Sequence, residues 1–192
     1  MLINTHKILA NNILRQASNE KVFLLDKKKF VWGNLKPDCV SKYKFKKHFY
    51  DESIEMILEK IDFLSTLTVE EIYFSYGRKK FSAELGVICH FICDFFCLAH
   101  NRRWRLKSAF KKHMMYEQEL NKIAKRYEFK KVDQELTNIK FVKEFIEKYI
   151  LEYENLDEYY EVDLDYSFFI CSNIINLVLE TVLANKCVEK VG

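Results

Sequence analysis

The stretch from residue 84 to residue 101 constrains the fold most, because it places ionisable side chains inside an apolar run. It reads ELGVICHFICDFFCLAHN, and an apolar run of this length predicts a buried helix. His90 and Asp94 are four residues apart, so on a helix they share a face and both could bind one metal ion. His100 lies six residues beyond Asp94, about 9 Å further along a continuous helix, which assigns it to a second, neighbouring ion.

A His–Asp pair one turn apart can also be a hydrogen-bonded pair in an apolar core, and for this pair alone that is the simpler interpretation. The other histidines favour metal binding. The chain has five histidines, and each has a carboxylate or another metal-type residue at a usable interval. His113 is followed one helical turn later by Glu117, and His48 is followed closely by Asp51. Imidazole nitrogens and carboxylate oxygens are ligands that zinc accepts.

The pattern His-x3-Asp-x5-His, here His90, Asp94 and His100, resembles that of the zinc-dependent phospholipase C family and the related single-strand-specific zinc nucleases. The His-x3-Glu of His113 and Glu117 follows thirteen residues after His100, and it favours the phospholipase branch. Two upstream segments extend the resemblance, which covers residues 1 to about 120: Gly33-Asn-Leu-Lys-Pro-Asp38 resembles Gly-x-x-x-Pro-Asp, and Lys47-His-Phe-Tyr-Asp51 resembles His-Phe-Tyr-Asp.

The resemblance implies two or three zinc ions. One ion would be bound by Asp38, His48, His90 and Asp94. A second would be bound by His100, His113 and Glu117, and a third by His6 with Asp94 as the bridge. Asp38 is also the candidate catalytic residue, because in the family it can orient or deprotonate the attacking water. The sequence does not separate that role from a ligand role.

The amino terminus is expected to complete the third site. Secreted family members use the amine and carbonyl of an amino-terminal Trp, and no Trp precedes His6 here. The short interval from Met1 to His6 matches the nuclease branch, so we expect the Met1 amine to reach the same ion if Met1 is retained. The bulky Leu2 should hinder removal of Met1.

The resemblance implies a phosphodiester hydrolase that uses a metal-activated water, with a phospholipid head group as the leading substrate. Two alternatives stay open: a 3′-nucleotidase or single-strand nuclease of the same fold, and a non-catalytic metal-binding scaffold. A net charge of +3 does not require a nucleic-acid partner. We therefore expect no stable nucleic-acid complex, and peripheral contact with a membrane is compatible with the substrate.

Few residues in this chain favour turns. It has four Gly and one Pro, with 49% hydrophobic and 31% charged residues, which indicates long helices joined by short loops. The 192 residues fit one core. We therefore predict an all-α, single-domain bundle over residues 1–192, with the metal ligands within residues 1–120.

Periodicity and capping signals place the helices. We expect residues 17–51 to form a long functional loop in which Pro37 turns the chain to present Asp38. Thr68 and Glu71 form a capping box that opens a short helix. The acidic residues 152–165 are expected to form a solvent-facing loop. The longer helices are expected over residues 2–16, 51–65, 82–105, 106–127, 133–153 and 168–187.

The six cysteines show no paired framework. Cys89, Cys93 and Cys97 repeat every four residues, so we interpret them as small hydrophobic residues on a helical stripe beside the metal-binding face. Free cysteines favour a reducing compartment, and the first residues lack the features of a secretory signal. We therefore expect a cytoplasmic protein whose last helix lies in the core rather than across a membrane.

Overall fold

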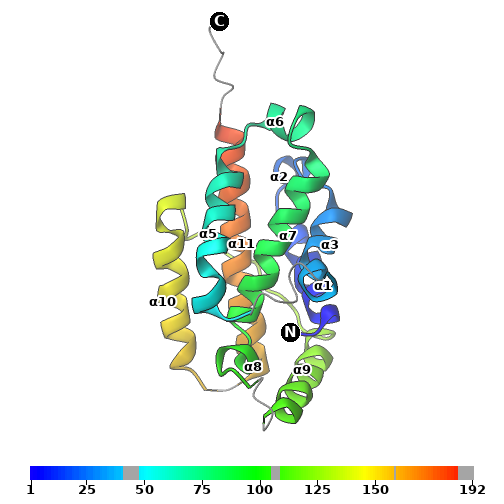
Figure 1. The fold of residues 1–192 in the computed structure, drawn as a ribbon, viewed down its shortest axis with the longest axis vertical. Coiled ribbons are helices and arrows are strands. Elements are labelled where there is room, and N and C mark those ends of the chain that lie inside the picture. Colours follow the sequence, from blue (N-terminus) through cyan, green and yellow to red (C-terminus); the bar gives the residue numbers. More distant parts are fainter. Residues whose placement is uncertain (41–47, 105–108, 158, 186–192) are drawn as a thin grey trace, which may run out of the picture.

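The computed structural model describes residues 1–40, 48–104, 109–157 and 159–185. Within these ranges every regular element is helical, which confirms the predicted all-α class (Figure 1). The elements are α1 (Ile3–Gln16), α2 (Asn19–Phe23), α3 (Lys27–Cys39), α5 (Tyr50–Thr66), α6 (Val69–Phe74), α7 (Arg78–Phe95), α8 (Leu98–Asn101), α9 (Phe110–Ala124), the 3-10 helix η1 (Ile139–Phe141), α10 (Val142–Glu154) and α11 (Tyr160–Ala184).

Helix α7 is central and contacts α1, α3, α5 and α11 (Figure 1). Its closest neighbour is α3, because glycines meet where the two helices cross. A Cβ atom on Gly33 would lie 2.1 Å from the carbonyl oxygen of Ala83, and one on Gly86 would lie 2.2 Å from that of Phe30. Only glycine permits this approach. The crossing brings the C-terminal turn of α3, which carries Asp38, next to His90 of α7.

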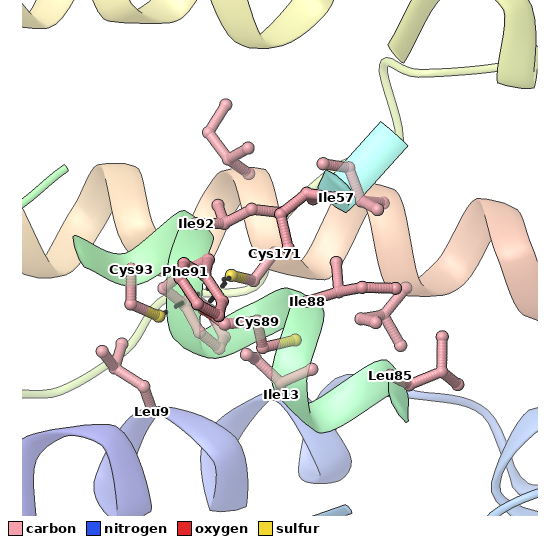
Figure 2. Packing of buried hydrophobic residues seen from close by; sticks show 14 of the residues in the cluster. Leu9, Ile13, Ile57, Leu85, Ile88, Cys89, Phe91, Ile92, Cys93 and Cys171 are labelled. Atoms are coloured by element: carbon pink, nitrogen blue, oxygen red, sulfur yellow. Dashed lines mark hydrogen bonds between the residues drawn. The ribbon is translucent and has the colours of Figure 1, made fainter. Parts of the chain in front are cut away.

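The apolar core is built around α7 and α11. Figure 2 shows Ile88 and Ile92 of α7 beside Cys171 of α11, and all three side chains are buried. By length and composition α11 could cross a membrane, but 67% of its most apolar window is buried inside the protein. In the described part of the chain, α11 therefore packs as a core helix, as predicted.

The predicted loop over residues 17–51 is wrong, because α2 and α3 lie within it. The Asp26 side chain caps α3 by accepting a hydrogen bond from the Lys29 amide at 3.0 Å. Pro37 lies inside α3, where its missing N–H removes only the bond to the Gly33 carbonyl. Asp38 is therefore presented by the last turn of a helix and not by a proline turn. Residues 41–47, including Lys47 of the upstream motif, lie outside the described residues.

The predicted continuous helix over residues 82–105 is wrong in its second half. Helix α7 ends at Phe95, Cys97 is extended, and α8 starts a new direction at Leu98. The expected junction at residues 105 and 106 lies outside the described residues. Helix α9, which carries His113 and Glu117, occupies part of the predicted range 106–127. The chain therefore turns between Asp94 and His100.

Two predictions in the C-terminal part are also wrong. The predicted helix over residues 133–153 begins later, with η1 at Ile139 and α10 at Val142. The Asn173 side chain binds the backbone before it: its Oδ1 accepts from the amides of Glu135 at 2.7 Å and Leu136 at 3.0 Å. Helix α11 begins at Tyr160, within the predicted acidic loop, and it buries Asp163. The expected helix end at Cys187 lies outside the described residues.

The N-terminal helices match the sequence more closely. Helix α1 covers nearly all of the predicted range 2–16, and α5 nearly coincides with 51–65. The capping box is confirmed: the Glu71 amide donates to Thr68 Oγ1 at 3.2 Å, and the Thr68 amide donates to Glu71 Oε2 at 2.9 Å.

Candidate metal centre

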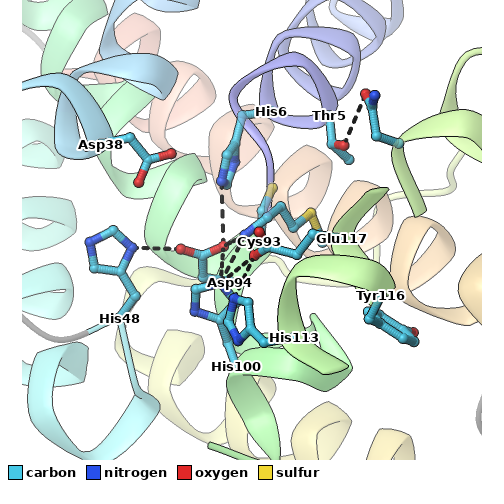
Figure 3. A network of polar contacts seen from close by, with 12 residues as sticks. Thr5, His6, Asp38, His48, Cys93, Asp94, His100, His113, Tyr116 and Glu117 are labelled. Carbon is cyan, nitrogen blue, oxygen red and sulfur yellow. Dashed lines mark hydrogen bonds and ion pairs between the residues drawn. The ribbon is translucent and has the colours of Figure 1, made fainter. Parts of the chain in front are cut away.

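Asp94 lies at the centre of a buried polar cluster and is itself 1% exposed (Figure 3). It occupies the last turn of α7, and its neighbours come from segments far apart in the chain: the N-terminus and α1, the residues just before α5, and α8. Oδ1 of Asp94 lies 2.5 Å from the Met1 amine, 3.4 Å from His6 Nε2 and 3.6 Å from His100 Nε2. Oδ2 lies 2.6 Å from His48 Nδ1 and 3.4 Å from His90 Nε2.

Glu117 is the second carboxylate of the cluster. Its Oε1 lies 3.0 Å from both His100 Nε2 and His113 Nε2, and 3.1 Å from the Met1 amine. His113 and Glu117 lie one turn apart on α9, as their spacing predicts. The Met1 amine and His100 join this group to Asp94, because each is close to both carboxylates.

Asp38 is the third carboxylate, and it is the most accessible of the three. Its side chain is 25% exposed, and its Oδ1 lies 3.8 Å from His90 Nε2. The donor atoms of Asp38, His6 and His90 all lie within 4.8 Å of one another. Burial and the nearby charge of Asp94 raise the pKa of Asp38.

The fold brings all nine predicted ligands together, but in different groups from those expected. The described residues form three sets whose donor atoms lie within 4.8 Å of one another: His6, Asp38 and His90; His48, Asp94 and His100; and Cys97, His100 and Glu117. The expected separation of His100 from Asp94 by about 9 Å along a helix is wrong, because the break after Phe95 folds His100 back onto Asp94.

The distances within the cluster fit a shared cation. Two ligands bound to zinc at about 2.1 Å with tetrahedral angles lie roughly 3.4 Å apart. The ring nitrogens of His6, His90 and His100 lie 3.4 to 3.6 Å from the oxygens of Asp94, which is too long for a good hydrogen bond. Both ring nitrogens of His6 are buried without a hydrogen-bond partner. An ion between His6 and Asp94 would give Nε2 of His6 a partner.

His90 is held in the tautomer that a metal requires. Its Nδ1 lies 2.7 Å from the backbone carbonyl oxygen of Asn34, which can only accept, so Nδ1 carries the proton. The lone pair of Nε2 then points to His48 Nδ1, 3.1 Å away. Burial and the neighbouring His6 lower the pKa of His90 well below its ordinary value, so the ring stays neutral. Second contacts of this kind orient metal-binding histidines.

In the absence of an ion, protons balance the carboxylates. Burial opposes ionisation of Asp94, but His100, the Met1 amine and His6 hold its pKa well below the ordinary range. Burial alone would lower the pKa of His6, but Asp94 raises it to about 9. Asp94 likewise contributes to raising the pKa of the Met1 amine, again against burial. A divalent cation would replace these protons.

The cluster is reached from two cavities. One of about 340 Å³ is lined by His48, Asp94 and His100, together with Phe49 and Tyr50 among its walls. The other, of about 470 Å³, is lined by residues that include Met1, Asp38, His100, His113 and Glu117. His100 belongs to both walls, so the cluster forms the partition between them.

The model of the zinc dependent phospholipase C family matches residues 5–166. The chain belongs to this family. The match includes every candidate side-chain ligand and extends well beyond the motifs, through the helices α10 and the start of α11. The zinc-dependent phospholipase C family requires zinc, in keeping with the candidate ligand groups of the cluster. No curated protein and no solved structure matches the chain.

Three residues at the centre were not identified from the sequence as part of it. Asn34 acts through its backbone carbonyl, which leaves no signal in the side-chain pattern. Cys97 was interpreted as a core hydrophobe. Asp163 is 1% exposed: its Oδ2 accepts hydrogen bonds from the Leu98 amide at 3.1 Å and the Tyr116 hydroxyl at 3.0 Å. It thereby ties α8 to α9, although its charge placed it in the predicted acidic loop.

Proposed function

We propose that this chain hydrolyses a phosphodiester, with a phospholipid head group as the substrate class and two or three zinc ions as cofactors. The observation that carries the proposal is the convergence of nine candidate donors on one buried cluster bordered by two cavities. Membership of the zinc-dependent phospholipase C family supports the same chemistry. As a purely structural core such a cluster would be costly, because even paired charges lose solvation when they are buried.

The residues that face the cavities have different proposed roles. Bound zinc would polarise a phosphoryl oxygen and acidify the attacking water. His48 and Asp94 would hold zinc at the wall of the smaller cavity. His90, fixed by the Asn34 carbonyl, keeps its lone pair aimed at the same point.

Asp38 is proposed to orient the attacking water and accept its proton. A quarter of its side chain is exposed, more than for Asp94 or Glu117, and its Oδ1 lies 3.8 Å from Nε2 of His90, which faces the same proposed zinc site. The raised pKa of Asp38 makes it a stronger base than an ordinary carboxylate once it is ionised. A proton taken up at Asp38 Oδ can leave directly to solvent.

The smaller cavity suits a head group better than a whole lipid. Its volume of about 340 Å³ is near the lower limit of small-molecule sites. Its walls combine the rings of Phe49 and Tyr50 with the Asp51–Arg103 ion pair. A head group could enter here while the lipid chains remain outside, which agrees with peripheral contact with a membrane.

The test combines metal analysis with a substrate panel. Protein purified without chelator is expected to contain two or three zinc ions and to release the head group from phosphatidylcholine vesicles. Asp38→Asn should lower kcat by about 10²–10⁴-fold, as expected for loss of a general base. Asp62→Asn, on the exposed side of α5, is the control and should leave kcat unchanged.

Three outcomes would contradict the proposal in different ways. Cleavage of single-stranded DNA in place of phospholipid would assign the chain to the nuclease activity of the related enzymes. Full zinc content without hydrolysis of either substrate would indicate a metal-binding scaffold. A chain without zinc would remove every catalytic version.

A further inference from the structure

Cys97 occupies the break between α7 and α8, midway between two candidate ligands. Its amide donates to the Asp94 carbonyl oxygen at 3.2 Å, and its own carbonyl oxygen accepts from the amides of His100 at 2.9 Å and Asn101 at 2.8 Å. The residue is fully buried. These backbone bonds fix Cys97 rigidly against the residues that precede and follow it in the metal centre.

The thiol of Cys97 lies among metal-binding atoms. Its Sγ, a ring nitrogen of His100 and a carboxylate oxygen of Glu117 all lie within 4.8 Å of one another. Cys93 and Cys171 contact each other, with their sulfurs 3.7 Å apart (Figure 2), and Cys93 also lies beside His6 (Figure 3). Within the part of the chain that the structure describes, no sulfur contacts that of Cys97, and its side chain lies beside His100 and Glu117.

We propose that Cys97 binds, as a thiolate, the same zinc ion as His100 and Glu117. Sulfur, nitrogen and oxygen are all ligand types that zinc accepts. On binding, the S–H bond of Cys97 breaks, a bond between sulfur and zinc forms, and the proton passes to solvent. The inference rests on the proposed zinc centre and adds to it a ligand that the family motifs do not contain.

The thiolate would give the zinc ions different abilities to acidify a bound water. It brings a full negative charge to an ion that already has the Glu117 carboxylate, so that ion retains little positive charge with which to acidify a water. The ion at His48, His90 and Asp94 has a single buried carboxylate instead. We therefore assign activation of the water to that ion and a mainly structural role to the ion at Cys97.

X-ray absorption at the zinc edge tests the proposal on the whole chain. Zinc–sulfur bonds scatter at about 2.3 Å, and zinc–nitrogen and zinc–oxygen bonds at about 2.0–2.2 Å. The zinc-loaded wild-type chain is expected to show one sulfur per chain. Cys97→Ser and Cys97→Ala should lose the sulfur signal, and Cys171→Ser, a matched change at another buried cysteine, should keep it.

The outcomes separate this inference from the proposed function. A zinc-loaded wild-type chain without a sulfur signal overturns the assignment of Cys97 and leaves the hydrolase proposal standing, and this measurement needs no variant. A sulfur signal that persists in a folded Cys97 variant also overturns it. A wild-type chain that binds no zinc refutes the proposed function itself.

Discussion

Replacement of Asp94 by Asn should disrupt the centre more than any other single change. The two carboxylate oxygens of Asp94 lie within 3.6 Å of five groups, two of which, the Met1 amine and His6, carry positive charge in the metal-free protein. Asparagine keeps the size of the side chain but removes the charge and turns one acceptor into a donor. The buried cations then have no partner at that position.

The magnitude follows from burial. Removing one partner of a buried ion pair costs about 3–5 kcal/mol, and Asp94 is 1% exposed. With a denaturant slope of about 2 kcal/mol per molar urea, the unfolding midpoint of the metal-free variant should fall by about 2 M. The Asp62→Asn control, an exposed carboxylate, should stay within about 0.5 kcal/mol of wild type.

The pH dependence of stability is an independent test of the contact between His6 and Asp94. The pKa of His6 is about 9 in the folded protein and 6.5 ordinarily, so the folded state binds the proton more tightly. The stability contributed by His6 is complete below pH 6.5 and is lost as the pH rises toward 9. At about 1.4 kcal/mol per pKa unit this amounts to about 3 kcal/mol. Without Asp94, burial and the nearby Met1 amine lower the pKa of His6, so the contribution of His6 to stability should change sign.

Urea unfolding of chelator-treated protein at several pH values measures both the loss of stability and the change in its pH dependence. Zinc analysis adds a third test, because Asp94→Asn should lose more than one ion per chain, whereas His113→Ala should lose one. If Asp94→Asn unfolds within 1 kcal/mol of wild type and keeps the full zinc content, Asp94 does not bridge the sites and the assignment of the centre is wrong.

Three further predictions concern the scaffold. Gly86→Ala forces a Cβ atom to within 2.2 Å of the Phe30 carbonyl oxygen, so it should destabilise the protein by about 1–3 kcal/mol or more and lower its zinc affinity. Gly77→Ala is the control: the space around Gly77 is open, so this change should strain only the backbone at φ 97° and leave zinc binding intact. Burial raises the pKa of Asp163 to about 7 from an ordinary 3.8, so the stability of the protein should fall as the pH rises from about 4 to 7. In denaturation experiments, Asp163→Asn should lose this dependence of stability on pH, and the exposed Asp165→Asn should keep it. A tag before Met1 replaces the buried amine with a peptide group and should lower zinc content, measured against the same tag placed after residue 192.

The parts of the centre that depend on local spacing could be predicted from the sequence. His90 with Asp94, and His113 with Glu117, each lie one turn apart on a helix, and helical periodicity alone determines that relation. The all-α class could be predicted from the scarcity of turn-forming residues. Both predictions are independent of which segments pack together.

The parts that depend on packing could not be predicted. The break that returns His100 to Asp94 is stabilised by the Leu98 amide, whose hydrogen-bond acceptor is Asp163, 65 positions later in the chain. The helix that carries Asp38 is held against α7 by the contact between Gly33 and Gly86. A proline and a lysine-rich segment favour a loop there locally, and the tertiary contact overrides that preference.

The composition of the cluster indicates that metal binding and folding are coupled. Asp94 is 1% exposed and Glu117 is 6% exposed, and burial opposes ionisation of both carboxylates. The metal-free protein meets this cost with two protons, on His6 and on the Met1 amine, and each of these cations is itself penalised by burial. Divalent ions supply more charge at the same place, and one of them would bind the unpartnered Nε2 of His6. Zinc is therefore expected to raise the unfolding temperature, by an amount that grows with the logarithm of the ratio of free zinc to its Kd.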